Sequence, residues 1–161
     1  MIKKTIAFGA FALAAAGMTA SGSAQDILAD PISDTVYLEA GFVPDPTVVN
    51  VISGGTIDVS TVVSECSGYI SDAPDVRLTF SASNSATASP LYIHAISDED
   101  TTLVINAPDG QWYCNDDGSE GLNPLVVFGP AQSGNYEIWI GSYEEGAYND
   151  ATLSISEIDG E

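Results

Sequence analysis

After residue 25, short segments of alternating apolar and polar residues follow one another along the chain. Val76, Leu78 and Phe80 alternate with polar residues, which is the two-residue period of a half-buried strand. The sequence has no long segment with an apolar stripe of helical period, and only a short helical turn around 58–63 is expected. The pattern therefore predicts an all-β fold. Strands are expected at 35–39, 47–52, 76–82, 91–96, 101–105, 125–128, 135–143 and 152–156.

Turn sequences separate these segments. Gly54-Gly55, Pro108-Asp109-Gly110, Asp117-Gly118 and Ser133-Gly134 combine the residues that tight turns favour. Many short strands joined by such turns are typical of a β-sandwich or a β-barrel. The length after residue 24 suits one domain, so we expect residues 25–161 to form a single domain, with 25–46 as an extended lead-in.

The first 24 residues have the order of a secretory signal peptide. Lys3 and Lys4 precede an apolar run at 6–16, and small residues follow up to Ala24. The run is shorter than the roughly 20 apolar residues that span a bilayer. We expect cleavage after Ala24, with Ala20 as the alternative, and no membrane insertion afterwards. The protein is therefore expected to be secreted or periplasmic.

The remaining chain is strongly acidic. Arg77 is its only lysine or arginine, whereas all 23 acidic residues lie after residue 24. Such a negative surface repels nucleic-acid phosphates and anionic lipids. Nucleic-acid binding is therefore not expected. A divalent cation, a basic partner, or a solvated surface suited to a salty environment remain as explanations.

Two cysteines, Cys66 and Cys114, occur in this chain with an export signal. An even number of cysteines in an oxidising compartment favours a disulfide. No histidine or second cysteine at ligand spacing supports a metal site instead. The closed loop is expected to stabilise the fold by roughly 3–4 kcal/mol on the chain-entropy model.

The sequence offers few groups for catalysis. His94 is the only histidine and lies inside an expected strand, which favours a structural role, and no lysine follows Lys4. The sequence also lacks a nucleophile elbow, a phosphate-binding glycine loop and the ligands of a zinc site. Hydrolysis by a pair of carboxylates stays open, because carboxylates are abundant.

Two loops instead carry oxygen ligands suited to calcium. Asp98 and Asp100 precede one expected strand, and Asn115, Asp116 and Asp117 lie in a turn that ends at Gly118. Calcium binds six to eight oxygen atoms, often from carboxylates and amides in loops. These five residues are the predicted calcium ligands, although Asp and Asn are also ordinary turn residues.

Aromatic residues gather in the C-terminal half. The two-residue period places Trp139 on the strand face opposite Ile138 and Ile140. Trp139 and Tyr143 could therefore form an exposed platform for a ligand, or Trp139 could pack under a loop. Trp112 is expected to pack beside Cys114.

Residues 74–143 resemble a bacterial pre-peptidase C-terminal domain. The resemblance rests on a strand at 75–80, an Asp-led strand that runs into a Pro-Asp-Gly turn at 100–110, the polar loop at 115–118, and the closing sequence Gly-Asn-Tyr-Glu-Ile-Trp-Ile at 134–140. It implies an antiparallel β-sandwich of jelly-roll type with about eight strands and no catalytic activity of its own. Some members of the family bind calcium or collagen. In this chain the segment follows a signal sequence, and no protease domain lies between them.

These observations predict an exported, non-catalytic accessory or binding module that calcium stabilises. A protein or a polysaccharide is the expected partner. One alternative is a hydrolase, either peptidase-associated or with paired carboxylates, and the latter would need a concave pocket and a carboxylate of raised pKa. Another is a structural subunit of the cell envelope or surface layer, which would associate with itself in a cation-dependent way.

Overall fold

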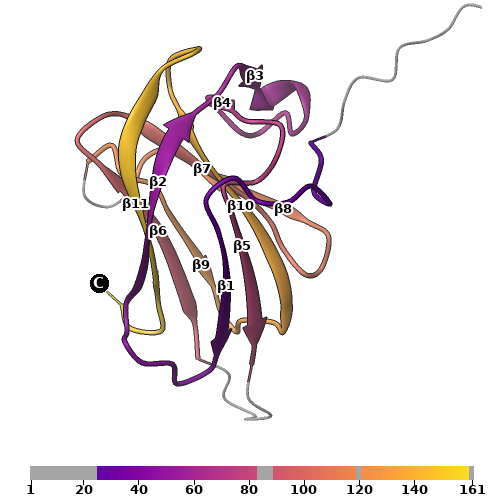
Figure 1. Ribbon diagram of the computed structural model, residues 1–161, viewed down its shortest axis with the longest axis vertical. Helices are drawn as coiled ribbons and strands as arrows, with labels where there is room; N and C mark the ends of the chain where they lie inside the picture. The colour runs from indigo at the N-terminus through magenta and orange to yellow at the C-terminus, as the bar shows by residue number, and fades with distance from the viewer. Residues whose placement is uncertain (1–24, 83–88, 119–120, 160–161) are drawn as a thin grey trace, which may run out of the picture.

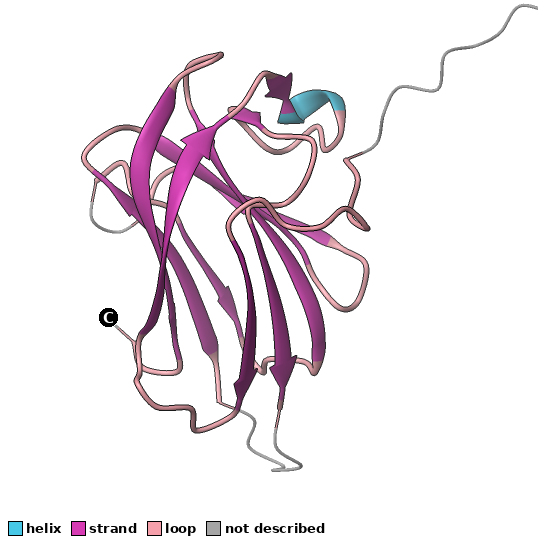
Figure 2. Cartoon of the chain, viewed as in Figure 1, coloured by secondary structure: helices cyan, strands magenta, loops and turns pink. Residues whose placement is uncertain are grey.

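The computed structural model describes residues 25–82, 89–118 and 121–159, which form two β-sheets packed face to face (Figure 1). One turn of 3-10 helix, η1, is the only helix in this part of the chain (Figure 2). The elements are β1 (Asp34–Glu39), β2 (Thr47–Gly54), β3 (Ile57–Asp58), η1 (Val59–Thr61), β4 (Tyr69–Ile70), β5 (Val76–Ser81), β6 (Leu91–Ser97), β7 (Thr101–Asn106), β8 (Trp112–Asn115), β9 (Leu125–Phe128), β10 (Gly134–Ser142) and β11 (Tyr148–Ser156).

The larger sheet has seven strands and is built around β10. The first half of β10 pairs with β5, and β1 lies beyond β5. The second half pairs on its other edge with β7, and β8 lies beyond β7. The short strands β4 and β3 extend the sheet beside the end of β10, where Ser142 pairs with Tyr69.

The smaller sheet has four strands in the order β2-β11-β6-β9. All of its pairs are antiparallel, and in the larger sheet only β1 and β5 run parallel among the described residues. The predicted all-β sandwich is confirmed. The segment 25–46 is not simply a lead-in, because β1 is an edge strand of the larger sheet.

Side chains from alternate positions of both sheets fill the space between them. Leu78 of β5 and Ile138 of β10 meet Ile93 of β6 and Leu153 of β11, and none of these four is exposed. Phe128 of β9 packs edge to face on two tyrosines, with ring centroids 5.0 Å from Tyr113 and 4.9 Å from Tyr136. Burial of this apolar surface is the main stabilising term of such a fold.

A second apolar cluster lies on the outer side of the larger sheet. It consists of Val59, Cys66, Ile70, Val104 and Trp139, with Val63, Trp112 and Cys114 packed against it. The segment from β3 to β4, which includes η1 (Figures 1 and 2), covers this cluster, because Val59, Cys66 and Ile70 of the segment pack in it. The predicted Cys66–Cys114 disulfide is confirmed, with Cα atoms 5.7 Å apart, and it joins this covering segment to β8.

The N-terminal segment covers another part of the same outer side. Arg77 on β5 forms an ion pair with Glu137 on β10, with 2.6 Å between Nε and Oε1. The guanidinium also donates hydrogen bonds to the carbonyl oxygens of Ile27 and Ala29, at 3.1 and 2.9 Å. The only lysine or arginine among the described residues therefore ties the N-terminal segment to the sheet.

Every strand expected from the sequence is present within one or two residues, except that β11 begins four residues early, at Tyr148. The strand β8 and the two-residue strands β3 and β4 were not predicted. No helix in the described part of the chain is long and apolar enough to cross a membrane.

Candidate binding surface and candidate calcium site

The outer side of the four-stranded sheet carries exposed aliphatic side chains on three of its strands. Val48 and Ile52 of β2 are 59% and 53% exposed, Ile96 of β6 is 41% exposed, and Val127 of β9 is 48% exposed. The register places them on one face of the sheet. On that face Ser154 of β11 pairs with Val48, Thr152 of β11 pairs with Ile96, and Tyr92 of β6 pairs with Val127, so polar and aromatic residues lie between the aliphatic ones. We call this surface the open face.

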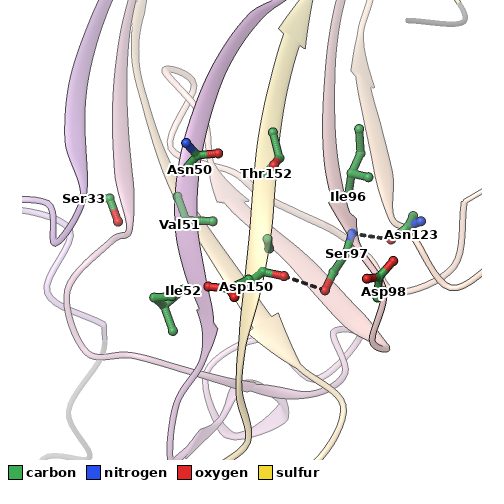
Figure 3. Close-up of a pocket in the computed structure, with 11 residues that line it drawn as sticks. Ser33, Asn50, Val51, Ile52, Ile96, Ser97, Asp98, Asn123, Asp150 and Thr152 are labelled. Atoms are coloured by element: carbon green, nitrogen blue, oxygen red, sulfur yellow. Dashed lines mark hydrogen bonds between the residues drawn. The ribbon is translucent and has the colours of Figure 1, made fainter.

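A hollow of about 690 Å³ lies on the open face (Figure 3). Apolar side chains of Ile52 and Ile96 and polar groups of Asn50, Asn123 and Thr152 contribute to its lining, together with the carboxylates of Asp98 and Asp150. We call it the first hollow.

Hydrogen bonds from Ser97 fix one side of the first hollow. Its Oγ donates to the carbonyl oxygen of Asp150 at 2.8 Å, and its backbone N–H donates to Oδ1 of Asn123 at 2.9 Å (Figure 3). The end of β6 is thereby held to β11 and to the segment before β9. Asp98, the next residue, consequently has a defined position at the rim.

The acidic triplet 98–100 is divided between two hollows. Asp98 lines the first hollow, whereas Glu99 and Asp100 line a second one of about 310 Å³ with Ser142, Tyr143, Glu144 and Asn149. The structure therefore places two of the predicted calcium ligands, Asp98 and Asp100, in the linings of different hollows.

Asp100 lies within the electrostatic field of Asp117 and Asp116. Burial raises the pKa of Asp100 above its usual range, and the negative charges of Asp117 and Asp116 raise it further. Oδ1 of Asn115, the neighbouring predicted ligand, is buried without a hydrogen-bond partner, which is an unfavourable state for an amide oxygen. A cation would lower the repulsion and supply a partner, so these four residues partly fit a calcium site.

These four residues meet only part of the requirements of a calcium site. Across residues 25–82, 89–118 and 121–159, no three His, Cys, Asp or Glu side chains gather closely enough to hold a metal ion. A calcium ion at Asp100 would therefore need amide, carbonyl or water oxygens for much of its coordination.

The expected aromatic platform is wrong for Trp139. Its side chain is fully buried in the outer cluster, 5.3 Å from the ring of Trp112, because η1 and the disulfide cover it. Tyr143 is 56% exposed and lines the second hollow. The alternation of β10 predicted the strand face of Trp139 correctly, and of the two alternatives that the sequence left open for this residue, the structure shows packing under a covering segment.

The sequence reasoning missed Asp75, whose carboxylate is buried where β5 separates from β10. Its Oδ2 accepts a hydrogen bond from the backbone N–H of Ile140 at 2.8 Å. Burial raises the pKa of Asp75 from 3.8 to about 7, although this hydrogen bond acts in the opposite direction. Asp75 lines neither hollow. In the sequence, only the position of Asp75 directly before a strand of apolar residues could have indicated that its carboxylate is buried.

Comparison with known proteins gives little further information. No family model matches the chain, and no curated protein matches it. Among solved structures, it is similar to the crystal structure of the pre-peptidase C-terminal domain of a collagenase from Bacillus anthracis. The two are 16% identical, the alignment covers 80% of this chain and 98% of that one, and the TM-score is 0.41.

Proposed function

We propose that the protein is an exported, non-catalytic accessory module that binds a protein or polysaccharide partner through its open face. The observation that carries this proposal is the set of exposed aliphatic side chains on that face, Val48, Ile52, Ile96 and Val127. Exposed apolar side chains are unfavourable in water, and several of them on one face of a sheet are typical of an interaction site. The disulfide is consistent with an oxidising, extracytoplasmic compartment.

Retention on immobilised ligands tests this proposal. We would measure binding of residues 25–161 to peptidoglycan, chitin, cellulose and immobilised casein, and compare it with the double variant Val48→Thr, Val127→Thr. Tyr37→Thr is the matched control, because Tyr37 is 75% exposed but lies on β1 of the other sheet. The proposal expects retention on at least one ligand that the double variant loses and the control keeps. Equal retention by all three proteins, or none on any ligand, would contradict it.

Calcium is the proposed stabilising ion, held by Asp100, Asn115, Asp116 and Asp117. The support is the electrostatic repulsion on Asp100 and the buried, unpartnered Oδ1 of Asn115. A ligand that binds only the folded state raises the melting temperature by mass action. We expect a calcium-selective rise of several degrees relative to chelator or magnesium.

Asp116→Asn with Asp117→Asn should abolish the calcium effect. The control pair Glu65→Gln with Asp72→Asn removes two exposed carboxylates near the β3–β4 segment and should keep the effect. An equal response to magnesium, or equal loss in both variants, would mean that calcium only screens the acidic surface.

Carboxylate-based hydrolysis is the second candidate function. Asp100 has a raised pKa and lines a hollow with Glu99 and Glu144, as a general acid with a neighbouring carboxylate would. This candidate predicts turnover of a glycoside or peptide substrate that Asp100→Asn removes. The structural-subunit alternative instead predicts that chelator reduces the molecular size in solution.

A further inference from the structure

The first hollow joins two carboxylates to an apolar floor. Asp98 and Asp150 come from different elements, the turn after β6 and the strand β11, and both are exposed. Ile52 and Ile96 line the same hollow. The alkyl part of a lysine or arginine packs on aliphatic side chains while its charged end stays near carboxylates, so the hollow matches both ends of such a side chain.

The described residues offer no second lysine or arginine that could pair with these carboxylates. Arg77 is the only lysine or arginine between residues 25 and 161, and it is held by Glu137 on the other sheet. The chain carries a formal net charge of −20, so the field around the hollow attracts cations and repels acidic ligands.

Other ligand classes fit this hollow less well. A bound metal needs several converging oxygen atoms, and only two carboxylates, those of Asp98 and Asp150, line this hollow. A neutral sugar would be expected to stack on an aromatic ring, but Trp139 is buried and none of the residues lining the first hollow is aromatic.

We propose that the first hollow binds the lysine or arginine side chain of an extended peptide segment in a partner protein. The peptide backbone lies along the open face, the alkyl part of the lysine or arginine side chain packs on Ile52 and Ile96, and its cationic group lies between Asp98 and Asp150. This inference rests on the proposed function, since it names the chemistry of the partner for the same surface.

Three capped pentapeptides test the inference by NMR titration of ¹⁵N-labelled residues 25–161 at 0.15 M salt. The probes are acetyl-Val-Lys-Val-Lys-Val-amide and the analogues with glutamine or glutamate in place of lysine. The lysine peptide should shift the backbone amides of Ile52, Ile96, Ser97 and Asp150. The glutamine analogue should bind about tenfold more weakly, because two exposed ion pairs are lost. The glutamate analogue should not bind.

Two charge variants separate local recognition from overall attraction. Asp98→Asn with Asp150→Asn should weaken the lysine peptide about fivefold to tenfold. Glu65→Gln with Asp72→Asn removes the same charge elsewhere and should change binding less than twofold.

Each remaining outcome decides between the two proposals. Equal weakening in both variants would overturn the inference, because attraction would then depend on net charge alone. Equal binding of the lysine and glutamine peptides at the same amides would also overturn it, while the open face would remain a binding surface. No shift with any peptide would overturn the inference, and the proposed function would then depend on the retention experiment.

Discussion

The outer faces of the two sheets differ in how they are covered. On the larger sheet, the β3–β4 segment, the disulfide and the N-terminal segment lie over Trp139, Val104 and Glu137. Trp139 and Val104 are completely buried there. On the smaller sheet, no described segment covers Val48, Ile52 or Val127, which remain about half exposed.

This difference separates apolar residues that stabilise the fold from apolar residues that remain available for contact with a partner. Apolar side chains on the larger sheet's outer face contact the protein's own covering segments and contribute to folding. Those on the open face contribute little until something binds them. Substitutions on the two faces should therefore have very different effects on stability.

Removal of the buried tryptophan should have the largest effect. Trp139→Ala is expected to destabilise the fold by about 3–5 kcal/mol, because it leaves a cavity under η1 and the disulfide. Urea unfolding followed by circular dichroism would measure it. Tyr37→Ala, on the exposed part of the same sheet, is the control and should change stability by less than about 0.5 kcal/mol. Similar values for the two variants would mean that Trp139 is not covered.

Loss of the disulfide should have the next largest effect. The double variant Cys66→Ala, Cys114→Ala opens a loop with a sequence separation of 48 residues. We expect a loss of roughly 2–4 kcal/mol, since the reduced chain gains entropy when unfolded. The same unfolding experiment measures it, and a reducing agent should destabilise the wild type equally. A stability unchanged by either treatment would contradict the role of the disulfide in holding the covering segment.

Asp75 should make stability depend on pH. Because its pKa rises from 3.8 when unfolded to about 7 when folded, its contribution is fully present below pH 4 and is lost as the pH rises to 7. Asp75→Asn keeps an acceptor for Ile140 and should stabilise the protein by a few kcal/mol above pH 7 and very little below pH 4. Each unit of the pKa shift is worth about 1.4 kcal/mol, and the cost of burying the N–H groups of the Asn amide offsets part of the total.

Thermal melts between pH 3.5 and 8.5 would measure this difference. Asp72→Asn controls for the loss of one negative charge at an exposed position. A difference between Asp75→Asn and wild type that stays constant across the pH range would contradict burial of an uncharged Asp75.

Substitutions on the open face should have the smallest effect on stability. Ile52→Thr with Val127→Thr should change the free energy of unfolding by less than about 0.5 kcal/mol for each residue, because both side chains are already about half exposed in the folded protein. The same variant should elute earlier from a hydrophobic interaction column. A loss of several kcal/mol would show that this face is covered in solution.

Local patterns in the sequence were sufficient to predict most of the fold. The alternation around Val76 and Ile138 identified two central strands, and the even cysteine number predicted the disulfide. Strand β8 was missed because Trp112–Asn115 is short and is recognised as a strand only beside β7. The parallel pairing of β1 with β5 also depends on residues about 40 positions apart, as Asp34 pairs with Val76.

The candidate site was less predictable because cover and proximity are long-range properties. Alternation places Trp139 on the outer side of β10, but whether that side is covered depends on Val59 and Cys66, over 70 residues earlier. Part of this arrangement depends on Gly141 of β10. A Cβ at this position would lie 2.7 Å from the carbonyl oxygen of Tyr69, so a larger residue would not allow β4 to approach β10 this closely. Their spacing in the sequence also led to the prediction that Asp98 and Asp100 belong to one calcium site, although the two residues line different hollows after β6.

Solvent paramagnetic relaxation tests the contrast between the two faces most directly. A neutral gadolinium chelate would be added to residues 25–161 with ¹³C-labelled methyl groups of Val and Ile. The account predicts strong relaxation of Val48, Ile52 and Val127 methyl groups and almost none of Val104 and Ile70, which are fully buried. Protection of Ile52 and Val127 equal to that of Val104 would contradict it, because the proposed binding surface would already be covered.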